Sequence, residues 1–159
     1  MTGADPVGRF IDFSAALTGF RRVDLLGTGM ARAYYDEVVA IVGERIVSRL
    51  VAVGASVIER HGAAGVEDEL RRRILGDELL GPLARNVMVL WYLGQWDQLP
   101  AEWRDRHGAS TLDADRVISP AAYTEGLVWK AIGAHPQGAK PQGFGAWNLP
   151  PPDLAASHG

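Results

Sequence analysis

The chain has 159 residues, no cysteine and a formal net charge of −3 at pH 7. Its length fits one domain, since domains run about 100–200 residues, and its 47% hydrophobic and 22% charged content is typical of a globular protein. The lack of cysteine excludes disulfides, thiolate nucleophiles, covalently attached haem and Cys-ligated zinc or iron–sulfur sites. The charge lacks the basic excess that nucleic-acid binding requires.

Two features of the sequence bear on membranes and export. No stretch approaches the roughly 20 apolar residues of a membrane span. The pair Arg21-Arg22 resembles a twin-arginine signal, but glycines and charges follow it where an apolar segment would be needed. We therefore expect neither a membrane span nor an export signal in this sequence.

Helical periodicity dominates the first two thirds of the chain. Pro6 suits the first turn of a helix that ends near Gly19. A long helical region is predicted over residues 29–60, broken near Gly43. A shorter helix is predicted over residues 66–75, and the next begins at Asp77 or at Pro82 and ends at Gly94.

The last third is predicted to be less regular. Residues 95–118 are polar and are interpreted as a surface loop with a short strand or turn, in which Asp113 and Asp115 are solvated. Ser119 and Pro120 then begin a helix that runs to Gly133. Six of the nine prolines lie at or after Pro120, so residues 134–159 are predicted to be extended.

These patterns predict an all-α fold, a compact bundle of about five to seven helices. The helical domain comprises residues 1–133. An extended tail rich in Pro, Gly and Trp, residues 134–159, is expected to pack on this domain or on a partner subunit.

No catalytic constellation emerges from the sequence. The four histidines form no HExxH arrangement, and no ligand cluster predicts a metal site. No strand precedes the motif Gly27-Thr28-Gly29, which argues against dinucleotide binding. His135, beside Pro136, is better explained as a structural histidine. The sequence predicts no catalytic, cofactor-binding or metal-binding residue in this chain.

The aromatic residues are unevenly placed and suggest an interface. All five tryptophans follow residue 90, and the 41 residues from Ser119 onward include only four charged side chains. Such a composition is typical of the core of an interface, whereas Trp91 is expected to lie in the domain core. The candidate partner contacts are Trp96, Trp129, His135, Pro136, Phe144, Trp147, Pro150 and Pro151.

The predicted helix after Ser119 has apolar or small residues on two sides. Tyr123, Leu127 and Ala131 form one stripe, and the other consists of Ala122, Gly126, Trp129 and Gly133. Small side chains let another backbone come close, and a helix of this kind is usually buried on both sides. The second side therefore suggests cover by the tail or by a partner chain.

Four segments occur in an order that resembles a known family: AALTGF at 15–20, LWYLG at 90–94, YTEGLVWKAIGAHP at 123–136 and KPQGFGAW at 140–147. Together they resemble the small subunit of FAD-dependent sorbitol and fructose dehydrogenases. They are similar, more distantly, to the gamma subunits of gluconate, glucose and glycoside 3-dehydrogenases.

The resemblance implies a non-catalytic subunit without its own cofactor. In such complexes a large flavoprotein of the glucose-methanol-choline class carries FAD, and a cytochrome c subunit often passes electrons on. The small subunit supports maturation, stability or export of the flavoprotein. The resemblance also implies export to the periplasm together with the partner, membrane association only through the complex, and no nucleic-acid partner. Because no export signal is expected in this sequence, the cytoplasm is the alternative location.

Two other functions remain open at this point. One is a free-standing helical adaptor. The other is an independent enzyme in which His135 and Glu125 act as acid and base.

Overall fold

A computed structural model describes residues 5–61 and 64–134 of the chain. Within these ranges it contains nine α-helices, one π-helical segment and one two-stranded sheet, so the predicted all-α class is confirmed. There are more helical segments than the five to seven helices expected, because the chain also forms several short segments of only five to seven residues each. None of the helices in these ranges is long and apolar enough to cross a membrane.

Three of the first four helices begin and end close to where local signals predict. The carboxylate of Asp5 caps the first helix by accepting from the backbone N–H groups of Val7 and Gly8. Gly43, at φ +90°, separates the third and fourth helices, as predicted. The short second helix was not predicted. These helices are α1 (Pro6–Thr18), α2 (Arg22–Gly27), α3 (Ala31–Val42) and α4 (Glu44–His61).

The next segments are α5 (Val66–Leu70), the π-helical η1 (Arg71–Leu75) and α6 (Leu80–Leu93). α6 begins at Leu80, between the two predicted starts, and both Asp77 and Pro82 contribute to its beginning. Asp77 Oδ1 accepts from the N–H groups of Leu79 and Leu80. Pro82 then lies in the first turn, where a backbone N–H has no intrahelical partner to lose.

The segment 95–118 is more structured than expected. It contains β1 (Gln95–Trp96), α7 (Ala101–His107) and β2 (Arg116–Val117). The strands pair antiparallel, with Gln95 opposite Val117. The expected short strand is present, but the interpretation of the rest as a surface loop missed α7.

The last helix is divided into α8 (Pro120–Glu125) and α9 (Leu127–Ala131). Ser119 caps α8 by accepting from the N–H of Ala122, as predicted. The predicted helix does not continue, because Gly126 adopts ψ 128° between the two pieces. A Cβ at Gly126 would lie 2.7 Å from the carbonyl oxygen of Tyr92, so the close approach of α6 requires glycine there.

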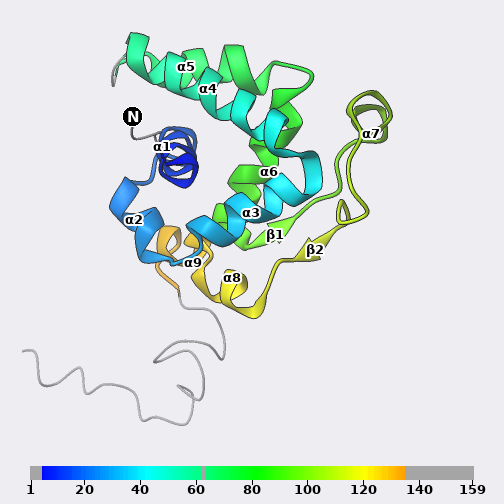
Figure 1. The fold of residues 1–159 in the computed structure, drawn as a ribbon. Coiled ribbons are helices and arrows are strands. Elements are labelled where there is room, and N and C mark those ends of the chain that lie inside the picture. Colours follow the sequence, from blue (N-terminus) through cyan, green and yellow to red (C-terminus); the bar gives the residue numbers. More distant parts are fainter. Residues whose placement is uncertain (1–4, 62–63, 135–159) are drawn as a thin grey trace, which may run out of the picture.

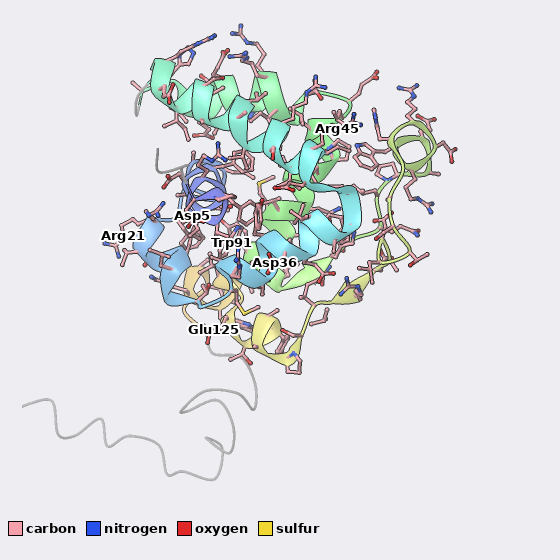
Figure 2. The ribbon with its side chains drawn as sticks, viewed as in Figure 1. Asp5, Arg21, Asp36, Arg45, Trp91 and Glu125 are labelled. Atoms are coloured by element: carbon pink, nitrogen blue, oxygen red, sulfur yellow. The ribbon has the colours of Figure 1, made fainter. Side chains whose placement is uncertain are left out.

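An aromatic cluster occupies the centre of the bundle. Trp91 of α6 is fully buried, as predicted. Its ring stacks with Phe10 at a centroid distance of 6.3 Å and meets Tyr34 edge-on at 5.0 Å. Figure 2 shows Trp91 between α1 and α3, and α1 packs against α2, α3, α4 and α6. This arrangement places α2, α8 and α9 together at one end of the molecule (Figure 1).

Candidate partner-binding site

A cleft of about 470 Å³ lies between α2 and the pair α8 and α9. Residues from the helices and from the turns beside them line this cleft. Ala134, the last residue of the described part, is also among the lining residues. The lining residues are Val23, Asp24, Gly27, Thr28, Thr124, Glu125, Gly126, Leu127, Trp129, Lys130 and Ala134.

An ion-pair network joins the two sides of this cleft. The carboxylate of Asp24 on α2 accepts from Arg21 Nε at 3.0 Å and from Lys130 Nζ on α9 at 2.5 Å. The Asp24 side chain is only 12% exposed. The hydrogen bond from Arg21, followed by that from Lys130, lowers the pKa of Asp24 well below its usual range. Asp24 therefore fixes α2 against α9 while it is ionised.

Both arginines of the pair at 21–22 are engaged within the domain. Arg21 is held by Asp24, which raises the pKa of its guanidinium. Arg22 pairs with the carboxylate of Asp12 on α1 and donates to the carbonyl of Gly8 at 3.2 Å. These contacts give the arginine pair a structural role.

Trp129, a predicted partner contact, borders the cleft. It is half-buried, and its indole Nε1 donates to the carbonyl of Tyr123 at 3.0 Å. The two rings also meet edge-on, with centroids 5.5 Å apart. The indole is thereby held in one orientation, with part of its surface left in solvent.

Glu125 lies on the same cleft, near the buried phenol of Tyr34. Tyr34 is 1% exposed, and its hydroxyl has no hydrogen-bond partner among the described residues. Burial, together with the negative charge of Glu125, raises the pKa of Tyr34. Figure 2 shows Glu125 beside α8 and α9, at the end of the molecule that carries the cleft.

Of the small residues predicted to admit a close backbone, Ala122 and Gly126 do so, whereas a Cβ at Gly133 would meet nothing within 4 Å. A Cβ at Gly94 would lie 2.3 Å from the carbonyl oxygen of Ala122, and Gly126 approaches Tyr92 in the same way. The backbone that comes close is the end of α6 in this same chain. The expectation that the tail or a partner covers Ala122 and Gly126 is therefore corrected.

Four exposed apolar side chains lie on or beside the elements around the cleft. They form what we call the apolar rim: Val23 (61% exposed), Leu26 (49%), Tyr123 (39%) and Ile132 (65%). Val23 also lines the cleft itself. Water contacts these side chains in the isolated domain, so covering them would be favourable.

Trp96, another predicted partner contact, lies in the core. It is 0% exposed, and its Nε1 donates to Asp113 Oδ1 at 2.8 Å. The same oxygen accepts from the N–H of Leu99 at 3.0 Å. Trp96 thus has no exposed surface for a partner in this conformation, and the expectation that Asp113 is solvated was wrong. Asp115 does lie at the surface, where it accepts from the N–H of Gln98 at 2.6 Å.

The remaining predicted contacts lie outside the described residues: His135, Pro136, Phe144, Trp147, Pro150 and Pro151. Sequence reasoning missed the contribution of α2 to the site. The Arg21–Asp24 pair could have been found from its i,i+3 spacing. The pairing of Asp24 with Lys130 spans 106 positions, and no local pattern predicts it.

Among residues 5–61 and 64–134, no group of three or more His, Asp or Glu side chains is placed to hold a metal ion. Comparison of the chain with known protein families, with curated proteins and with solved structures found no match. The function is therefore inferred from the residues and their arrangement.

Proposed function

We propose that this chain is the non-catalytic small subunit of an FAD-dependent sugar or polyol dehydrogenase complex. It binds and stabilises a large flavoprotein of the glucose-methanol-choline class, which holds the FAD and oxidises the substrate. A cytochrome c subunit and co-export to the periplasm belong to the same proposal, with the cytoplasm as the alternative location.

The observation that carries this proposal is the apolar rim around the cleft between α2 and α9. Exposed Val, Leu, Tyr and Ile side chains on neighbouring elements are the composition of a docking surface. The charge-poor segment with Phe144 and Trp147 follows directly after Ala134 at the edge of this cleft. The aromatic residues that a partner could contact thus follow in sequence after a region whose apolar side chains are exposed.

The rigid frame around the rim also supports docking. The Asp24–Lys130 ion pair and the Trp129–Tyr123 contact hold α2, α8 and α9 in one arrangement before a partner arrives. Binding to a preorganised surface loses less conformational entropy than binding to a mobile one. These contacts account for Asp24 and Lys130 without a reaction.

The test is co-expression with a candidate flavoprotein, such as the product of an adjacent dehydrogenase gene. The double variant Val23→Asp/Ile132→Asp places two charges on the rim. We expect it to weaken the complex by at least tenfold, since desolvating an unpaired carboxylate is costly. The matched control is Leu112→Asp, because Leu112 is 45% exposed but lies outside the rim.

The measurement is size exclusion of the complex with flavin absorbance, together with the melting temperature of each isolated variant. Wild type and the Leu112 variant should elute with the flavoprotein, and the double variant should not. If all three co-elute equally, the rim is not the docking surface. If the wild type fails to bind the flavoprotein, the proposed function itself is wrong.

An independent enzyme stays the second candidate because Glu125 lines a cleft whose size suits a small ligand. In this case Glu125 and His135 would serve as acid and base. Turnover by the isolated chain that Glu125→Gln abolishes would favour the enzyme. Binding to an unrelated protein and not to the flavoprotein would favour a free-standing adaptor.

A further inference from the structure

A second cleft, of about 390 Å³, lies between the beginning of α4 and the end of α7. It is separate from the cleft at α2 and α9, since α7 and α2 lie on opposite sides of the molecule (Figure 1). Figure 2 shows Arg45 where α4 begins, on the side toward α7. The lining residues are Arg45, Ile46, Arg49, Leu79, Arg106 and His107.

The charged side chains that line this cleft are arginines. Three arginines and a histidine line it, and the carboxylates of Asp77 and Glu78 line the adjoining hollow, which shares Arg49, Leu79, Arg106 and His107 with it. Arg106 pairs with Glu78 at 2.9 Å. The side chains of Arg45 and Arg49 make no ion pair or hydrogen bond with any described residue. Most other arginines in the described ranges pair with a carboxylate. These paired arginines are Arg21, Arg22, Arg32, Arg71, Arg72, Arg73, Arg104, Arg106 and Arg116.

Helix stability does not explain Arg45 and Arg49. Arg45 lies in the first turn of α4, where the positive end of the helix dipole disfavours a cation. The two arginines are spaced i,i+4, so their like charges repel each other along the helix. Arg106 and His107, by contrast, are in the last turn of α7, where cations are favourable.

The other walls of the cleft are held in place by specific contacts. Trp103 Nε1 donates to the carbonyl of Leu79 at 2.9 Å, which fixes α7 against the cleft floor. The rings of Trp103 and His107 lie 5.1 Å apart. Ile46 and Leu79 give the floor an apolar surface. The cleft therefore combines exposed arginines, of which only Arg106 is held by a carboxylate among the described residues, with an apolar floor.

We propose that this cleft binds a small organic dianion, a phosphate monoester or a dicarboxylate. The guanidinium groups of Arg45 and Arg49 supply paired N–H donors, which match the oxygens of either anion. The apolar floor at Ile46 and Leu79 takes the organic part of the ligand. Bound anion would also relieve the repulsion between the two arginines.

The experiment uses the full chain alone, with phenyl phosphate and phthalate as probes. Binding is measured by titration calorimetry and by the melting temperature, which a ligand of the native state raises with its concentration. Sodium chloride at the same ionic strength controls for screening. Phenyl phosphate should bind more tightly than inorganic phosphate, because the floor contacts only the phenyl ring.

The decisive variant is Arg45→Gln/Arg49→Gln. Both side chains are exposed, so the substitution should leave the fold intact, as circular dichroism can verify. We expect the double variant to bind phenyl phosphate or phthalate, whichever the wild type prefers, at least tenfold more weakly than the wild type does. The matched control is Arg60→Gln, an exposed arginine near the far end of the same helix that has no ion pair with any described residue.

The two probes and the variants distinguish the possible ligands. Preference for phenyl phosphate identifies a phosphate ester, and preference for phthalate identifies a dicarboxylate. The proposal is overturned if the double variant binds as tightly as the wild type, if chloride reproduces the effect, or if neither probe binds. Loss of flavoprotein binding in the double variant, without binding of either probe, would assign the cleft to carboxylates of the partner instead. Because the assay uses the isolated chain, its result does not depend on the proposed subunit role.

Discussion

The arrangement of α2 and α9 depends on one residue, Asp24, through its carboxylate. It accepts from cations on both its own helix and α9. Its pKa is lowered in the folded chain, so its contribution to stability is present above the unfolded pKa, near 4. That contribution is lost as the pH falls toward the folded pKa.

We therefore expect Asp24→Asn to lower the free energy of unfolding at pH 7, with a smaller difference from wild type at pH 3. Urea denaturation at the two pH values measures this. The control is Asp36→Asn, whose exposed pair with Arg32 contributes about 0–1 kcal/mol. An Asp24 effect that is the same at both pH values would contradict the assigned role.

Asp113 illustrates a residue whose environment the sequence did not reveal. Its neighbours in sequence are polar, which favours a solvated interpretation. In the structure its carboxylate satisfies the buried indole N–H of Trp96 and the backbone N–H of Leu99. A buried donor needs a partner, and the partner here comes from another part of the chain.

At the scale of elements, helix boundaries with strong local signals were predicted correctly. Pro6, Gly43, Gly94 and Ser119 each act at the position where the sequence predicts a start or stop. The short helices α2 and α7 were missed. A helix of six or seven residues has little intrinsic stability and forms because of tertiary contacts.

The contact between the end of α6 and α8 yields a prediction. Gly94 has φ +67°, and a Cβ there would lie 2.3 Å from the carbonyl oxygen of Ala122. We expect Gly94→Ala to destabilise the fold by about 2–4 kcal/mol, from left-handed strain plus displacement of α8. Urea denaturation measures the loss.

The matched control is Gly19→Ala. Gly19 also ends a helix in the left-handed region, at φ +77°, but a Cβ there meets nothing within 4 Å. We expect a cost of about 1–2 kcal/mol from strain alone. Equal losses for the two variants would mean that α8 moves away from α6 without cost.

At the scale of the whole molecule, the prediction concerns Trp147, which lies outside the described residues. If it anchors the flavoprotein, Trp147→Ala should weaken the complex by about 2 kcal/mol or more, as interface hot spots do. The melting temperature of the isolated chain should then stay unchanged. Calorimetric titration and thermal unfolding measure the two quantities.

Asn148→Ala is the neighbouring control for this variant. A loss of monomer stability without a loss of affinity would place the anchor on this domain. If neither quantity changes, residues 134–159 serve as a loose linker, and the interpretation of the C-terminal segment as an apolar contact is wrong.

The sequence by itself determined the helical class, the buried position of Trp91 and the boundaries marked by proline, glycine and capping serine, because these depend on periodicity and local backbone chemistry. Only the tertiary structure decided that Trp96 is a core residue, that Gly126 divides the last helix, and that Arg45 and Arg49 face α7. Each of these depends on segments far apart in sequence, whose side chains and carbonyls meet only after the helices have packed.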